Sequence, residues 1–361
     1  MRLEQERIRP GSRNLAMAAG ALALAVALAP LSPSLAASDD NFYAGKTAKL
    51  LLSAGEGGAY STYGRLLTRH LTNHLAGNPG FIVQSLPGGG GLRATNFLFT
   101  QAPKDGSTLG MIHATVILAP LYGTKAAMFD SREFNWLGAM NSSSGVCVAW
   151  HESPIKTWDD VVNKEFIVGS SGAGSQMEVM PLMINQLFGT KIKVISGYKD
   201  GTSVFLAMQR GEVHGRCGGI ITSLRSSRPE WLAEKKVVVP IAIATQRHPS
   251  YPDSPSIMEF AKDDHTRNVL QLVFTPQEFD RPVLTPPGVP AERVALLRQA
   301  FNATMRDPAL IEEAKKLRIE VDFVTGENLL QTIRNAFAMP PEVVKAAKEA
   351  TGNLGEGGGG E

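Results

Sequence analysis

The stretch that decides the fold is KLLLSAGEGGAYSTYGRLL, residues 49–67. Its first four residues, Lys49 to Leu52, predict a short strand that is largely apolar. A glycine-rich turn follows, and a helix is expected from Tyr60 to Leu75, with Tyr63 and Leu67 on one face. A strand, a glycine turn and a helix together form the repeating unit of an α/β fold.

The same unit recurs on both sides of a polar break near residue 143. The strands expected are 81–83, 108–113, 146–150, 166–168, 193–195 and 237–242, and the helices expected are 92–100, one beginning at Thr157, 175–187 and 203–210. From there the chain looks helical, with helices expected at 290–305, 308–317 and 325–337, each opened by proline or a hydroxyl residue. We therefore predict an α/β protein with two mostly parallel sheets and flanking helices.

The C-terminal helical stretch is too uniform to form a domain of its own, which suggests a discontinuous first domain. We expect residues 37–143 plus 243–351 to form lobe 1 and residues 144–242 to form lobe 2. The crossing segments would act as a hinge, and the cleft between the lobes is the usual place for a small ligand. The last residues, 352–361, are mostly glycine and predict a flexible tail.

The N-terminal residues 1–36 have the pattern of an export signal. Four arginines precede an apolar run from Leu15 to Leu31, and small residues then lead to a cleavage site near Ala36. The alternative is a membrane anchor, but the run is short, rich in alanine and followed at once by polar residues. We expect Sec-dependent export with removal of this segment.

The charge balance changes when that segment is removed. The full chain has 36 Lys plus Arg and 34 Asp plus Glu, a net charge of +2. Residues 1–36 hold four arginines and two glutamates, so the mature chain has 32 side chains of each sign. This balance excludes a nucleic-acid binder, which needs clustered basic residues, and it requires any anion to be bound by local geometry.

Glycine-rich turns between strand and helix are the most informative chemical feature. They occur at 55–61 and 87–91 in the first block and at 169–175 and 198–203 in the second. Such turns leave main-chain N–H groups free at a helix N-terminus, where an anion is favoured. The alternative is that each turn needs glycine only for its backbone geometry. Four such turns in two blocks favour an anion-binding cleft.

Signatures of catalysis or metal binding are weak. No complete nucleotide-binding loop or hydrolase nucleophile motif occurs, so we predict no cofactor and no catalytic residue. His70 and His74 are four residues apart on a helix but lack a third metal ligand, and we interpret them as a solvated face. His113 and His214 are each either a ligand contact or a structural histidine. Arg216 either holds a carboxylate or forms a surface ion pair.

The two cysteines, Cys147 and Cys217, leave two interpretations open. In an oxidising compartment they can form a disulfide. Alternatively, both are buried free thiols.

Five motifs occur in a fixed order along the mature chain: GGAYSTYGRLL at 57–67, PGGGG at 87–91, APKDGSTL at 102–109, GSSGAGS at 169–175 and PPGVP at 286–290. In this order the chain resembles the Bug-type extracytoplasmic solute receptors of tripartite tricarboxylate transporters. The resemblance implies a two-lobe type II periplasmic binding protein, a Venus flytrap, that acts as a monomer in the periplasm. It implies binding of a small di- or tricarboxylate, with no nucleic acid involved, and delivery of that ligand to the membrane permease subunits of a tripartite transporter.

Receptors of this family hold a ligand carboxylate mainly through main-chain amides of one loop from each lobe. The residues that the resemblance and the glycine turns place at the site are Gly57, Gly58, Ala59, Tyr60, Ser61, Gly89, Gly90, His113, Ser170, Ser171, Gly172, Ala173, Gly174, Ser175 and Tyr198. Family members commonly have an aspartate near the position of Ser61. Its absence here argues against a ligand that needs this carboxylate, such as an amino acid.

Two other functions fit the same scaffold. A periplasmic ligand sensor would dock on a signalling partner instead of a permease, and the sequence does not separate the two. An exported enzyme would need a clustered acid, base or nucleophile, whereas the expected cleft loops offer only hydroxyls and Lys199.

Overall fold

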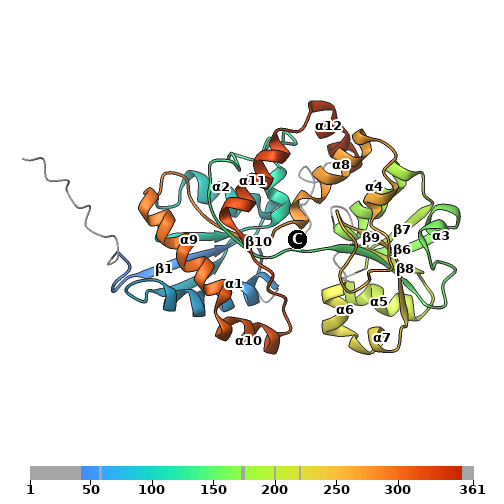
Figure 1. Cartoon of the computed structure of the whole chain (residues 1–361), viewed down its shortest axis with the longest axis horizontal. Helices are drawn as coiled ribbons and strands as arrows, with labels where there is room; N and C mark the ends of the chain where they lie inside the picture. Colours follow the sequence, from blue (N-terminus) through green and yellow to red (C-terminus); the bar gives the residue numbers. More distant parts are fainter. Residues whose placement is uncertain (1–41, 57–58, 172–174, 199–200, 219–220, 352–361) are drawn as a thin grey trace, which may run out of the picture. The chain divides into compact units, whose positions relative to one another are not determined.

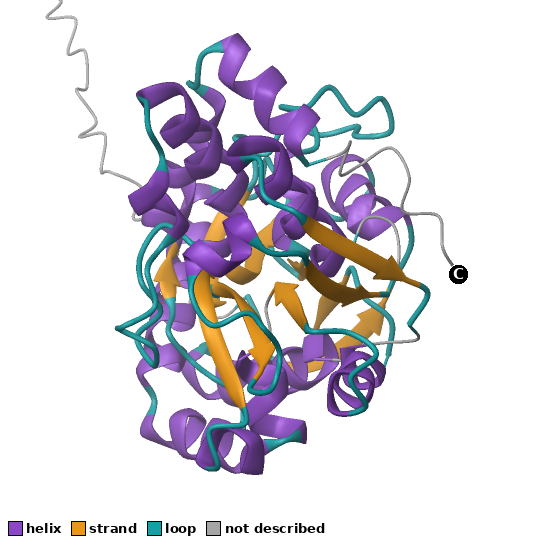
Figure 2. Ribbon diagram, turned by 90° about the vertical axis from the view of Figure 1, so that its right-hand side faces the viewer, coloured by secondary structure: helices purple, strands orange, loops and turns teal. Residues whose placement is uncertain are grey.

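A computed structural model of the chain describes residues 42–56, 59–171, 175–198, 201–218 and 221–351. The predicted export signal and the glycine-rich tail lie outside the described residues. None of the described helices is long and apolar enough to cross a membrane. The described chain contains two β-sheets with helices packed on them (Figure 1; Figure 2).

The first sheet begins with the predicted strand and helix of residues 49–67. Its strand order is β11 (Val324–Thr325), β4 (Asn135–Asn141), β10 (Asp280–Thr285), β3 (Thr108–Met111), β1 (Thr47–Leu52) and β2 (Gly80–Ser85). Its helices are α1 (Ala59–Leu71), α2 (Leu92–Thr100), α9 (Ala291–Arg306), α10 (Pro308–Leu317) and α11 (Gly326–Phe337), with short 3₁₀ turns η2 (Thr72–His74), η3 (Gly89–Gly91) and η4 (Ala114–Leu118). Apolar side chains of β1, α1 and α9 pack into one buried cluster.

The second sheet is built from the middle of the chain. Its strand order is β7 (Ile192–Ser196), β6 (Phe166–Ser170), β8 (Gly215–Gly218), β5 (Gly145–Trp150) and β9 (Val237–Ile243). Its helices are α3 (Trp158–Asn163), α4 (Gln176–Phe188), α5 (Gly201–Gln209), α6 (Ile221–Ser227) and α7 (Pro229–Ala233). Helix α3 begins where expected, because the Thr157 side chain and Asp160 form a reciprocal cap at its N-terminus.

Both sheets are mixed, so the prediction of mostly parallel sheets was wrong. Strands β1, β2 and β3 are parallel, but β10 runs antiparallel to β3 and β4, and β11 runs antiparallel to β4. In the second sheet, β5 is antiparallel to β8 and β9. A crossover connection within one sheet makes neighbouring strands parallel, whereas β5 and β10 each enter their sheet from elements of the other one.

Helices α8 (Asp264–Phe274) and α12 (Pro341–Ala350) pack on each other. We placed both in lobe 1, but α12 packs against α8 and α4, and Figure 1 shows α12 beside α8. Val269, Ala347 and Met183 belong to the same buried cluster, which also contains side chains of the second sheet. The two helices therefore bury their apolar faces with the second sheet, and the boundaries of the predicted lobes stay a prediction.

Two neighbouring segments connect elements of the two sheets. One is residues 142–144, between β4 and β5, and the other contains the 3₁₀ turn η6 (Thr275–Gln277), between α8 and β10. The Ser143 main-chain N–H donates to the Gln277 carbonyl oxygen at 2.8 Å. Asn141 and Asp280 are partners across β4 and β10. These contacts bring together residues that are 134 and 139 positions apart in the sequence.

Cys147 and Cys217 form a disulfide between β5 and β8, where they are directly opposite each other. Both side chains are fully buried. Of the two interpretations that the sequence left open, a disulfide or two free thiols, the structure has the disulfide.

Candidate functional site: a cavity around Arg281

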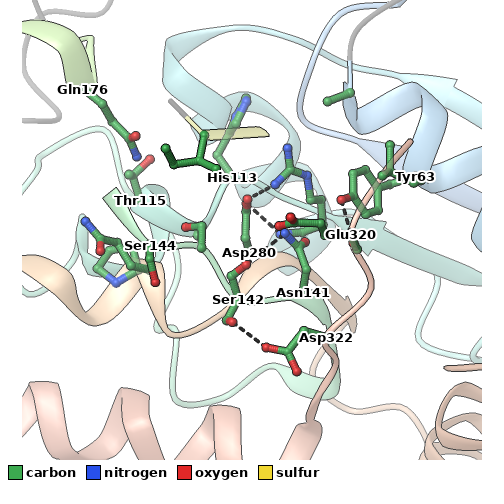
Figure 3. A pocket seen from close by; sticks show the side chains of 18 of the residues that line it. Tyr63, His113, Thr115, Asn141, Ser142, Ser144, Gln176, Asp280, Glu320 and Asp322 are labelled. Atoms are coloured by element: carbon green, nitrogen blue, oxygen red, sulfur yellow. Dashed lines mark hydrogen bonds and ion pairs between the residues drawn. The ribbon is translucent and has the colours of Figure 1, made fainter. Parts of the chain in front are cut away.

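A cavity of about 790 Å³ opens beside the two connecting segments. Its walls come from α1 and η4, from the segment 142–144, from α4 and α6, from η6 and the start of β10, and from residues 317–322 at the end of α10 and beyond it. Figure 3 shows the side chains of 18 of the residues that line it. The size suits a small organic molecule.

Arg281 supplies a positive charge to this cavity. Its guanidinium lies 4.6 Å from the ring centroid of Tyr63 and 5.4 Å from that of Tyr60, and it forms an ion pair with Asp280. The residue has a φ of +50°, which non-glycine residues adopt rarely and which often marks a functional position. The aromatic faces and the ion pair hold the guanidinium against the cavity wall.

The charge of Arg281 reaches other groups in the cavity. Burial lowers the pKa of His113, and Arg281 lowers it further, against a main-chain hydrogen bond with Gly90 that raises it. Burial raises the pKa of Tyr60 to about 12, against the lowering effect of Arg281. His113 is therefore neutral near pH 7.

His113 lines the cavity and also connects β1 to the glycine turn before α2. Its Nδ1 lies 3.0 Å from the Ser53 hydroxyl, and its main-chain N–H donates to the same hydroxyl at 2.8 Å. Its ring contacts that of Tyr60 edge-on, with 4.6 Å between centroids. A Cβ on Gly91 would lie only 2.9 Å from Nδ1, at a φ of +105°. The histidine thus has a structural role in addition to its position at the cavity.

Three buried polar atoms of the cavity wall have no hydrogen-bond partner among the described residues. They are Asn141 Oδ1, Gln277 Oε1 and Arg281 Nε. Asn141 is only 4% exposed and Gln277 only 8%. Buried polar groups without a partner are rare and costly, so their gathering in one cavity indicates a polar ligand.

Residues 317–322 close one side of the cavity. The Tyr63 hydroxyl donates to the Glu320 carbonyl oxygen at 2.8 Å, and the Glu320 carboxylate pairs with Arg225 of α6. The Ser142 hydroxyl donates to Asp322 Oδ2 at 2.8 Å, as Figure 3 shows. This segment therefore contacts α1, α6 and the segment 142–144 at once.

The residues predicted for the site are only partly brought together. Ala59, Tyr60 and His113 line the cavity. Gly57, Gly58, Gly172, Ala173 and Gly174 lie outside the described residues. The remaining predicted residues are described but are not part of the lining; they are Ser61, Gly89, Gly90, Ser170, Ser171, Ser175 and Tyr198.

In the second block, side chains of the predicted loop form hydrogen bonds with each other and with Glu178. The Ser170 hydroxyl donates to Glu178 Oε2 at 3.1 Å and lies 3.1 Å from the Ser175 hydroxyl. Ser196 donates to the same carboxylate oxygen at 2.8 Å. Glu178 thus places a negative charge in the first turn of α4, at the helix end where we expected an anion to bind.

Interpreting His70 and His74 as a solvated face was wrong. His70 Nε2 lies 2.8 Å from Glu313, His74 Nε2 lies 3.0 Å from Asp307, and the His70 side chain is only 11% exposed. The first contact joins α1 to α10, and the second joins η2 to the N-cap residue of α10. Within the described ranges, no three His, Cys, Asp or Glu side chains gather as a metal site would require.

His214 and Arg216 are also placed by the structure. His214 Nδ1 accepts from the Ile167 main-chain N–H at 3.2 Å, which favours the structural interpretation. Arg216 is buried with its guanidinium 5.1 Å from the Phe205 ring centroid, so it is not a surface residue. Neither residue lines the cavity.

Comparison with known proteins identifies the family. A family model described as tripartite tricarboxylate transporter family receptor matches residues 64–348. A UPF0065 protein from Bordetella bronchiseptica is 24% identical over 299 residues, which are 80% of this chain and 82% of that protein. A TctC solute binding protein from Polaromonas, solved with no ligand, has a TM-score of 0.66 and 15% identity, covering 85% of this chain and 99% of that chain.

A second solved structure is that of MatC from Rhodopseudomonas palustris with bound malate. Its TM-score is 0.56 at 18% identity, and the match covers 84% of this chain and 99% of that chain. These likenesses confirm the predicted fold class, a two-lobe α/β fold of the periplasmic binding proteins. The family model extends over most of the sequence, and the chain therefore belongs to the receptors of the tripartite tricarboxylate transporter family.

Proposed function

We propose that this chain is a periplasmic receptor that binds a small di- or tricarboxylate in the cavity around Arg281 and delivers it to the permease of a tripartite transporter. The family match supports a solute-binding receptor, and the related MatC structure holds malate, a dicarboxylate. We keep the predicted monomeric state as part of this proposal.

Arg281 is the observation that carries the proposal. A guanidinium matches the two oxygens of a carboxylate, and its Nε–H has no partner among the described residues. Its side chain is only 18% exposed, so a ligand carboxylate would meet it in a partly water-excluded site. The ion pair with Asp280 lowers the net charge of this group, which fits a ligand that also binds elsewhere in the cavity.

The glycine turns remain part of the proposed site. We propose that main-chain amides of 57–61 and 170–175 bind a carboxylate of the same ligand, as the family resemblance implies. Ala59 and Tyr60, at the start of α1, already line the cavity. Arg281, whose guanidinium stacks on Tyr60 and Tyr63 of the same helix, would then bind the ligand beside the start of α1.

A ligand screen tests the binding step. Malate, succinate, citrate and other organic acids are added to the purified protein, and the melting temperature is measured. An acid present at a hundred times its Kd should stabilise the folded state by about 2.7 kcal/mol. If none of the acids changes the melting temperature, the proposal fails.

The variant Arg281→Met tests the site itself. It should weaken binding of the best acid at least about tenfold, because one charge-assisted hydrogen-bonded contact is lost. Arg132→Met is the matched control, because Arg132 also pairs with a nearby aspartate, Asp130, and stacks on an aromatic ring, Phe337, but lies outside the cavity.

Uptake of the labelled acid by cells that carry either variant in place of the original chain tests delivery to the permease.

A further inference from the structure

We propose that Asn141 and Gln277, beside Arg281, form a subsite that binds a hydroxyl group of the ligand, so that the receptor selects hydroxy acids over the same acids without the hydroxyl. This inference rests on the proposed function, because it names the chemical class of carboxylate that the cavity takes. It concerns side chains that come from β4, η6 and β10, and not the glycine turns.

The three side chains are brought together by the connecting segments. Asn141 is the last residue of β4 and is paired across the strands with Asp280, the residue before Arg281. Gln277 ends η6 and is held against the other segment by the hydrogen bond from Ser143 to its carbonyl oxygen. Their position is therefore set by the main chain, and each side chain lines the cavity.

The unpartnered atoms have the hydrogen-bonding pattern that a hydroxy acid can satisfy. Asn141 Oδ1 and Gln277 Oε1 are acceptors and need a donor, whereas Arg281 Nε is a donor and needs an acceptor. An ionised carboxylate only accepts, so it can satisfy Arg281 but neither amide oxygen. A hydroxy acid offers both groups, because its hydroxyl can donate to one amide oxygen while its carboxylate accepts from Arg281.

The orientation of the Asn141 amide is fixed by a contact on its other side. Its Nδ2 donates to the Ser142 carbonyl oxygen at 3.1 Å, which leaves Oδ1 as the acceptor. Because Asn141 is only 4% exposed, an acid without a hydroxyl leaves this oxygen without a matching ligand group. Sites built to bind a substrate hydroxyl discriminate strongly against analogues that lack it.

Two matched pairs of acids test the proposal by calorimetry on the purified protein. Malate differs from succinate by one hydroxyl, and citrate differs from tricarballylate in the same way. The hydroxy acid of the pair that fits the cavity should bind at least about tenfold more tightly. Asn141→Leu and Gln277→Met, which remove the amide oxygens at nearly constant volume, should each lower this ratio, and Asn141→Leu should bring it close to one.

Asn302→Leu is the control for Asn141→Leu. Asn302 Oδ1 is also buried without a partner among the described residues, but it lies on α9, outside the cavity, so the ratio should stay as in the original chain. Equal affinities within both pairs, or a ratio that both cavity variants leave unchanged, overturn the inference while carboxylate binding stands. If the original chain binds none of the four acids, the proposed function falls and this inference falls with it.

Discussion

The guanidinium of Arg281 lies 4.6 Å from the ring centroid of Tyr63, whose hydroxyl donates to the Glu320 carbonyl oxygen on the other side. One tyrosine thus positions the cavity's arginine and also holds the segment 317–322. Because the ring and the hydroxyl contribute separately, two substitutions can divide their effects.

Tyr63→Phe should lower the free energy of unfolding by about 1 kcal/mol, because it removes one hydrogen bond but keeps the ring under Arg281. Tyr63→Leu should cost more, because it also removes the cation–π contact and leaves a buried site less well filled. Urea unfolding of the three proteins measures both differences. Equal stability of the Phe and Leu variants would show that the Tyr63 hydroxyl contributes to stability and the aromatic ring does not.

Gly91 should tolerate no side chain. Gly91→Ala places a Cβ 2.9 Å from His113 Nδ1 at a φ of +105°, so we expect a loss of at least about 2 kcal/mol in the free energy of unfolding. Gly123→Ala is the control, because Gly123 also has a positive φ, +70°, but no atom lies within 4 Å of the new Cβ. The control should lose only about 1 kcal/mol. If Gly91→Ala loses no more unfolding free energy than the control, His113 moves aside without cost.

The disulfide should stabilise the second sheet. It closes a loop with a sequence separation of 70, and a crosslink of this length typically contributes about 2–4 kcal/mol. The double variant Cys147→Ala, Cys217→Ala should therefore unfold at a lower urea concentration than the oxidised protein. Reduction of the original protein should shift its midpoint in the same direction, and the double variant should not respond to reductant. An unchanged midpoint on reduction would contradict the prediction.

Several strands could be predicted from the sequence because their burial is visible in their own residues. Strand β1 carries LLL at 50–52 and β9 begins with VVV at 237–239, and such runs predict strands without any tertiary information. The turn between β1 and α1 could also be predicted locally, because the glycine-rich residues 55–58 indicate it. These units also carry the motifs that indicated the family, which is why the fold class could be predicted.

Strands β8 and β10 could not be predicted in this way. The first three residues of β10 are Asp280, Arg281 and Pro282, and β8 reads GRCG at 215–218. Neither has the alternation or apolar run of a strand, and both are stabilised by the neighbours with which they pair. Because we expected the chain after 242 to be helical, Arg281 had no predicted position.

The same limit applies to the candidate site. Tyr60 begins the helix expected after one predicted strand and His113 ends another, so their place near a cleft could be inferred from the order of elements. Asn141, Gln277 and Arg281 meet only because β4 and β10 pair at their ends and a main-chain hydrogen bond joins the two connecting segments. Nothing in the local sequence of these residues indicates that pairing.

His113 should make stability depend on pH below neutrality. Burial lowers its pKa in the folded protein, and Arg281 lowers it further, whereas in the unfolded chain it titrates at about 6.5. As the pH falls below about 6.5, the unfolded state therefore takes up a proton before the folded state does. The free energy of unfolding should fall by up to about 1.4 kcal/mol per pH unit until the folded pKa is reached.

His113→Asn removes the titrating group and should flatten this part of the curve. Urea unfolding at pH 7.5, 6.5, 5.5 and 5.0 gives the stability of both proteins, and the quantity to compare is the change from pH 7.5 to 5.0. The original protein should lose more stability than the variant over this interval, because other titrating groups contribute equally to both. Parallel curves would mean that His113 takes up its proton as readily in the folded protein as in the unfolded chain, and that the charge of Arg281 does not reach it.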